Sequence, residues 1–263
     1  MRSKLLWVWI LAGFSVAEVH AGAWTLPEDK GQLILSTSRT VAPVRAVFGE
    51  NIDFDKNSAQ LFLEYGLWDD VTVGVTAFGE FSTTDDIVET RAGAHVRHRL
   101  WTGEDGDVIS VQAGFSLPAE SLLGGSLGDS RPFSAPEYDI RLLYGRGWQW
   151  ELGNSFISSE LGFRMRGESL DDQIKLDITA GHEPVKGVLG LMSIFTSVPL
   201  GGDTDTSLKI SPSIAYTLWP WLGENEKKPW QPISPDTVQL GVTWDALQPE
   251  NGLEMGVSIW RSF

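Results

Sequence analysis

The last segment of the chain, 251–263, alternates apolar residues with small or polar ones and ends on an aromatic residue. One parity carries Leu253, Met255, Val257, Ile259, Arg261 and Phe263, and the other carries Gly252, Glu254, Gly256, Ser258 and Trp260. A period of two is that of a β-strand, whose successive side chains point to opposite faces. The segment is therefore predicted to be a strand with one apolar face. A half-buried edge strand of a soluble protein would alternate in the same way, so this stretch alone leaves both classes open.

The same alternation recurs along the chain between turn-forming residues. It is clearest in 59–65, 71–77, 109–115, 174–180 and 238–244, and weaker in 30–41, 91–100, 138–144, 156–166, 188–198 and 208–218. In 30–41, Ile34 and Arg39 break the parity, and in 188–200 the parity is unclear. With the last segment, these stretches make about twelve predicted strands, an even number that is typical of bacterial outer-membrane barrels. The length of 263 residues fits one all-β domain.

The first residues have the pattern of a secretory signal peptide. Arg2 and Lys4 precede an apolar run, 5–16, and small residues then offer a cleavage site at 19–21 or at 21–23. We predict that 1–21 is the signal peptide and that 22–263 is the exported barrel. The chain contains no cysteine, so disulfides cannot stabilise it. No later stretch reaches the roughly 20 apolar residues of a transmembrane helix.

The polar parity of the predicted strands favours a membrane barrel over a soluble sandwich. Many of its positions are glycine, serine or threonine, as in 72–76 and 110–116. A polar strand face in bulk water has no steric need for small side chains. Side chains that crowd into a narrow lumen do need to be small. A soluble all-β protein stays the alternative. The formal net charge of −15 argues against a nucleic-acid partner.

Aromatic and acidic residues are divided between alternate connections. One set of connections carries Trp68, Trp101, Trp148, Trp150, Trp219, Trp221 and Trp230, and the other set carries Glu50, Asp53, Asp55, Asp85, Asp86, Glu120, Asp129, Glu168, Asp171, Asp172, Asp203 and Asp205. Tryptophan prefers the membrane–water interface, so the first set is predicted to lie on the periplasmic side. The acidic loops would then lie outside. There they could meet the divalent cations that bridge lipopolysaccharide, although plain solvated loops would look the same.

Three stretches resemble known outer-membrane proteins. The terminal strand, with Val257, Ile259 and a final Phe263, resembles the C-terminal assembly signal that the outer-membrane insertion machinery reads. The segments 21–27 and 31–34 resemble the start of small Gram-negative barrels grouped with the putative transporters of phenol meta-cleavage pathways, and 63–74 resembles a strand–turn–strand found in them. The resemblance implies an outer-membrane β-barrel with a transport role. Arg261 and Trp68 depart from the usual patterns.

No catalytic or metal-binding constellation is evident in the sequence. His95 falls on the polar parity, and Ser110 lies on the next segment, but a nucleophilic pair needs an orienting third group. The spacings of histidine and carboxylate residues do not match those of metal sites. We therefore expect no enzyme activity and no cofactor. An outer-membrane lipid hydrolase centred on His95 is the less favoured alternative.

Charged residues gather on the polar parity of consecutive predicted strands. The residues predicted to line a pore are Arg91, His95, Arg97, Arg99, Arg141, Glu160, Arg164, Lys175 and Asp177. Rows of arginine and lysine in a narrow pore favour the passage of anions. The competing interpretation is that these cations pair with nearby carboxylates and only fill the lumen. The leading functional hypothesis is thus a passive outer-membrane channel for small solutes with a preference for anions. A closed barrel with a structural or binding role is the alternative.

Overall fold

A computed structural model describes residues 22–45, 51–82, 88–118, 135–167, 171–201, 205–218, 236–248 and 252–263. The predicted signal peptide, 1–21, lies outside them. The strands are β1 (Gly31–Arg45), β2 (Asn51–Trp68), β3 (Val71–Ser82), β4 (Val88–Thr102), β5 (Val108–Pro118), β6 (Glu137–Trp150), β7 (Gly153–Arg166), β8 (Gln173–Val185), β9 (Val188–Pro199), β10 (Ser207–Thr217), β11 (Asp236–Asp245) and β12 (Leu253–Ser262). No helix in the described ranges is long and apolar enough to cross a membrane.

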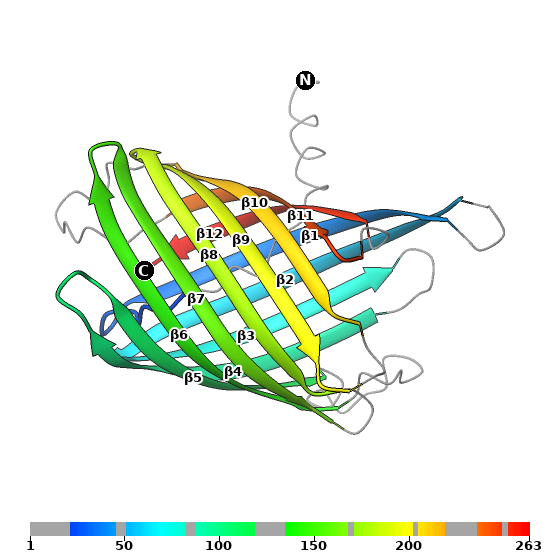
Figure 1. The fold of residues 1–263 in the computed structure, drawn as a ribbon, viewed down its shortest axis with the longest axis horizontal. Helices are drawn as coiled ribbons and strands as arrows, with labels where there is room; N and C mark the ends of the chain where they lie inside the picture. Colours follow the sequence, from blue (N-terminus) through cyan, green and yellow to red (C-terminus); the bar gives the residue numbers. More distant parts are fainter. Residues whose placement is uncertain are drawn as a thin grey trace, which may run out of the picture.

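The strands form one closed antiparallel barrel (Figure 1). Each strand pairs with its neighbours in sequence, and β1 pairs with β12 from Gln32↔Ser262 to Val41↔Leu253. At the end of this seam, Gly31 and Phe263 exchange two backbone hydrogen bonds of 2.8 and 2.9 Å. Closure leaves no unpaired sheet edge at the seam, which a membrane-spanning sheet requires. The predicted fold, an all-β, single up-and-down transmembrane barrel of about twelve strands, is confirmed.

Alternation along each strand places apolar side chains outside and smaller or polar ones inside. In β6, Ile140 and Leu142 are 52% and 53% exposed, whereas Arg141 and Leu143 are 3% and 0% exposed. The outward residues thus make an apolar belt, and the lumen takes the opposite parity.

The two irregular stretches are exceptions to this rule, and the register shows which way their side chains point. On β1, Ile34 points into the lumen and is almost fully buried, while Arg39 is exposed on the outer face. On β9, Leu189 and Leu191 are the inward residues. The apolar parity is ambiguous here because this part of the lumen is itself filled by apolar side chains.

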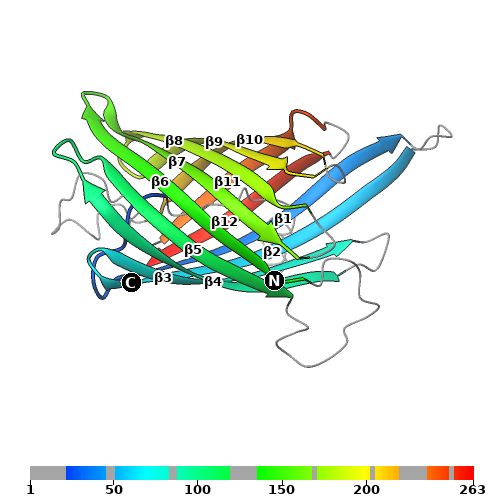
Figure 2. The same ribbon diagram turned by 60° about the horizontal axis from the view of Figure 1, so that its bottom comes forward.

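The two ends of the barrel differ. One end, the turn end, carries the short connections between β2 and β3, β6 and β7, and β8 and β9, together with the start of β1 and the end of β12. The opposite end is the loop end, where β1 and β2 extend beyond their neighbours (Figures 1 and 2). Trp68, Trp101, Trp148 and Trp150 lie at the turn end, and Asp171, Asp172 and Asp205 lie at the loop end. Of the other predicted residues, Asp53 and Asp55 lie on β2, and the rest lie outside the described ranges.

Candidate functional site

The first part of the segment before β1, 22–27, lies inside the barrel at the turn end, whereas Glu28, Asp29 and Lys30 are exposed. The Ser110 hydroxyl on β5 donates to the carbonyl of Ala23 at 2.5 Å, and Arg97 on β4 donates to the carbonyl of Trp24 at 3.1 Å. The Leu26 amide donates to the Thr72 hydroxyl on β3 at 2.7 Å. These bonds hold the backbone of the segment against the inner wall. The segment therefore occupies lumen space that a solute would otherwise use.

Two inward glycines make room for this segment. A Cβ at Gly66 would lie 2.1 Å from the carbonyl oxygen of Pro27, and one at Gly145 would lie 2.8 Å from the Trp24 ring. Both distances are shorter than side chains tolerate. The absence of side chains at these positions is thus a packing requirement of the filled lumen.

An apolar cluster fills more of the turn-end half of the lumen. Its buried members are Ile34, Phe62, Leu189, Leu191, Ala215 and Trp260. Phe156 packs against the cluster and also meets the Trp24 ring edge-on, with centroids 6.0 Å apart. The N-terminal segment and the cluster therefore form one continuous filling of side chains.

Arg97 and Glu64 form the first charged network. Both are fully buried, and Arg97 Nη2 donates to Glu64 Oε1 at 2.8 Å and to Gln112 Oε1 at 2.9 Å. His95 Nε2 lies 2.8 Å from the same carboxylate, and the His95 ring stacks on Phe62. Because Arg97 also binds the Trp24 carbonyl, this network ties the N-terminal segment to β2, β4 and β5.

Arg141 is the centre of the second network. It donates to Asp139 at 2.5 Å, to Glu160 at 2.9 Å and to Asp177 at 3.3 Å. Asp139 also accepts from Arg164 at 3.1 Å. One guanidinium thus holds carboxylates from β6, β7 and β8 together, and its own charge is compensated.

Along β1 and β8–β12, many inward side chains form uncharged hydrogen-bonded pairs instead. These pairs are Ser36–Ser258, Thr179–Ser193, Ser211–Thr243, Gln239–Ser213 and Thr217–Thr237, with distances of 2.7 to 3.1 Å. The lumen therefore has a charged wall and a hydroxyl wall.

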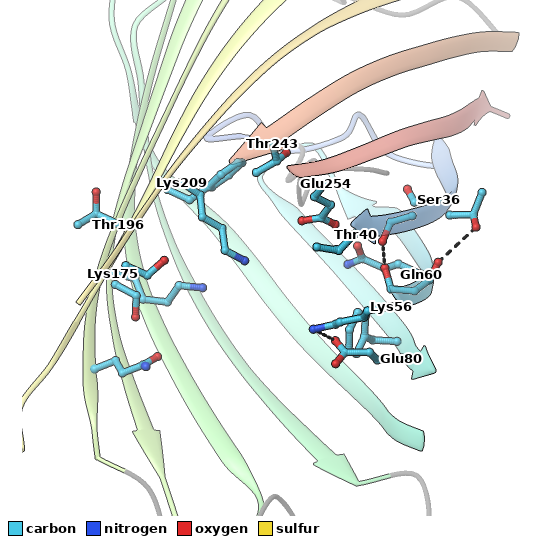
Figure 3. A pocket seen from close by; sticks show the side chains of 18 residues that line it. Ser36, Thr40, Lys56, Gln60, Glu80, Lys175, Thr196, Lys209, Thr243 and Glu254 are labelled. Atoms are coloured by element: carbon cyan, nitrogen blue, oxygen red, sulfur yellow. Dashed lines mark hydrogen bonds and ion pairs between the residues drawn. The ribbon is translucent and has the colours of Figure 1, made fainter. Parts of the chain in front are cut away.

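A pocket of about 340 Å³ occupies the loop-end half of the lumen (Figure 3). The amino groups of Lys175 on β8 and Lys209 on β10 project into it from one side. Gln60 and the ion pair of Lys56 with Glu80 face them from β2 and β3. This pocket is the candidate site for a solute.

All nine residues predicted to line a pore lie on the inward parity of β4, β6, β7 and β8. Seven of the nine interact with other lumen residues in the networks described above or at their edges: Arg91, His95, Arg97, Arg141, Glu160, Arg164 and Asp177. Lys175 lines the pocket, and Arg99 forms no ion pair with any described residue. Sequence reasoning missed Trp24, Trp260 and Lys209.

The structure separates His95 from Ser110. The Ser110 hydroxyl is bound to Ala23, while His95 contacts Glu64 and Phe62. Ser155 does lie 2.9 Å from His182 Nδ1, but this pair is on the outward parity at the turn end. Within the described ranges, no group of three or more histidine, cysteine or carboxylate residues could hold a metal ion.

The barrel is similar to solved outer-membrane barrels. One is the COG4313 outer membrane channel from Pseudomonas putida F1, with a TM-score of 0.57 and 12% identity over 94% of this chain and 100% of that chain. Another is the KdgM porin, with a TM-score of 0.54 and 9% identity over 88% of this chain and 99% of that chain. No protein-family model matches the sequence, and no curated protein is similar to it. These likenesses support the outer-membrane barrel fold. The narrower resemblance to transporters of phenol meta-cleavage pathways stays a prediction.

Proposed function

We propose that the protein is a non-enzymatic outer-membrane channel for the passive uptake of small solutes, with a preference for anions. The observation that carries the proposal is a closed barrel with an apolar outer belt and a polar pocket in the loop-end half of its lumen. An exterior of this kind is suited to lipid, and a polar interior is suited to a hydrated solute. Two of the solved barrels similar to this one are a channel and a porin, which supports the same role.

The turn end is proposed to face the periplasm and the loop end the outside. Outer-membrane barrels have short periplasmic turns, and tryptophans gather at membrane interfaces. Trp68, Trp101 and Trp150 are exposed at the turn end. Ile259 and Phe263 are exposed and Val257 shares their parity but is buried, and these three residues are proposed to form the assembly signal that the insertion machinery reads. Lipid and lipopolysaccharide are the other proposed partners.

The proposed anion preference rests on a small excess of positive charge. On the charged wall, six cations face five carboxylates: Arg91, Arg97, Arg141, Arg164, Arg166 and Lys175 against Glu64, Glu137, Asp139, Glu160 and Asp177. Arg99 adds a further cation on the inward parity of β4. Paired arginines contribute little net field, so the preference is expected to be modest.

Single-channel recording tests the channel role directly. The detergent-folded protein is expected to give discrete openings in a planar bilayer, and a salt gradient is expected to give a reversal potential of the anion-selective sign. Lys175→Glu should abolish or invert this preference, because it makes the net charge of the lumen more negative by two units. Lys30→Glu, at the turn end, is the matched control and should leave the sign unchanged. A folded barrel without openings would contradict the channel and favour the closed barrel with a binding role.

Signal-peptide cleavage is proposed to occur after Ala21. Gly22 and Ala23 are buried inside the barrel, and the Ala23 carbonyl accepts the bond from Ser110. Cleavage after Ala23 would remove both residues and this contact. The intact mass of the protein purified from outer membranes is expected to correspond to a chain that begins at Gly22. A mass that corresponds to a start at Trp24 would contradict this site.

A further inference from the structure

The loop-end pocket has a lining unlike that of the filled turn-end half. Nine of its eighteen lining residues are serine or threonine, and none is an aliphatic residue. The amides of Gln60 and Gln173 and the rings of Phe78 and Phe195 add to this surface. Its chemistry is therefore that of dense hydrogen-bonding groups beside two aromatic rings. Three cations and two carboxylates complete the lining: Lys56, Lys175, Lys209, Glu80 and Glu254.

One lysine in the pocket forms no ion pair with a described residue. Lys56 is paired with Glu80 at 2.5 Å. Lys209, by contrast, forms no ion pair with any described residue, and its amino group points into the cavity beside Lys175 (Figure 3). A cationic donor placed in this way forms a strong, charge-assisted hydrogen bond with a carboxylate.

The hydroxyl and amide groups of the lining require a ligand with hydrogen-bonding groups in addition to a carboxylate. An apolar solute that displaced water from this surface would leave many donors and acceptors unpaired, which is costly. A ligand with several hydroxyls would satisfy them, and its C–H faces could lie against Phe78 or Phe195. The volume of about 340 Å³ accommodates a molecule the size of a monosaccharide.

We propose that the loop-end pocket is a binding site for a polyhydroxylated carboxylate of monosaccharide size, that is, a sugar acid. Lys209 binds the carboxylate, and the Ser, Thr and Gln side chains bind the hydroxyls. This inference rests on the proposed channel function, because it identifies the class of solute that the outer half of the lumen receives. Unsubstituted aromatic solutes are excluded by the same lining.

Isothermal titration calorimetry of the mature protein, folded in detergent, tests the pocket with three probes. D-glucuronate carries both features, D-glucose carries only hydroxyls, and benzoate carries only a carboxylate. Glucuronate is expected to bind about tenfold or more tightly than either, because each missing feature removes at least one strong contact. Equal binding of glucose would overturn the role of the charge, and equal binding of benzoate would overturn the role of the hydroxyls. An absence of glucuronate binding would overturn the site.

Variants assign the two roles to residues. Lys209→Met is expected to weaken glucuronate binding about tenfold and to leave glucose binding unchanged, because only the carboxylate contact is lost. Gln60→Met is expected to weaken both sugars by a similar factor. Lys30→Met, outside the pocket, is the control and should change neither. If Lys209→Met has no effect, the assignment of the carboxylate is wrong.

Calorimetry in detergent measures binding without transport. The binding pocket and the channel function can therefore each be refuted without the other. Glucuronate binding without conductance would contradict the channel and leave the pocket intact. Conductance without glucuronate binding would contradict the pocket and leave the channel intact.

Discussion

A chain that begins at Lys30 is expected to conduct severalfold more current per barrel than a chain that begins at Gly22. The truncation removes the segment that Arg97, Thr72 and Ser110 hold inside the turn-end half of the lumen. Pore diameter and lining set conductance, so removal of this filling widens the narrowest part of the path. Both chains can be produced without the signal peptide, folded in detergent and recorded in planar bilayers.

The truncation spares the barrel itself. Residues Lys30 and Gly31 keep their backbone bonds to Gly66 and Phe263, so the β1–β12 seam is retained. A full-length chain with Glu28→Gln, a change at an exposed side chain of the same segment, should conduct like the unmodified protein. Equal conductance of the long and short chains would mean that segment 22–30 does not limit the path.

Glu64→Ala is expected to lower the free energy of unfolding by about 3–5 kcal/mol, because it leaves the guanidinium of Arg97 buried without its carboxylate. Both side chains are fully buried, and Glu64 also accepts the contact of His95. Urea unfolding in detergent or lipid vesicles, followed by tryptophan fluorescence, gives the change.

Two further variants separate the buried charge from simple loss of contacts. Glu64→Leu combined with Arg97→Met should recover most of the stability, since apolar side chains can replace a buried pair. The recovery should be incomplete, because the Arg97 bond to Trp24 is also lost. Glu80→Ala breaks the partly exposed pair with Lys56 and should cost no more than about 1 kcal/mol. Equal costs for Glu64→Ala and Glu80→Ala would refute the role of burial.

The strands could be predicted because alternation is a local property of an extended backbone. The parity of Tyr138, Ile140 and Leu142 indicates an outward face without knowledge of any partner strand. The inward assignment of Arg97, Arg141 and Lys175 follows from the same rule. It fails at Ile34, where an apolar side chain points inward, and at Arg39, where a charged one points outward.

The sequence could not predict whether an inward charged side chain lies in a buried network or lines a pocket. Arg97 and Glu64 are 33 residues apart in the chain and meet only because β2, β3 and β4 are neighbours at one height in the barrel. Parity alone makes Arg97 and Lys209 equivalent candidates for a pore wall. The structure places Arg97 in a buried network and Lys209 in the lining of a pocket.

Local alternation, turn residues and the aromatic C-terminus thus determined a barrel of about twelve strands with a polar interior. Only the tertiary structure decided how that interior is used. Closure of β1 on β12 fixes the register, and the register sets which inward side chains share a height. Residues 22–27 and Trp260 fill the turn end because their hydrogen-bonding and packing partners lie at the same height in the barrel. Lys209 lines the loop-end pocket and forms no ion pair with a described residue. Contacts across a lumen depend on the distance in space between side chains of different strands. The order of residues along one strand does not give this distance.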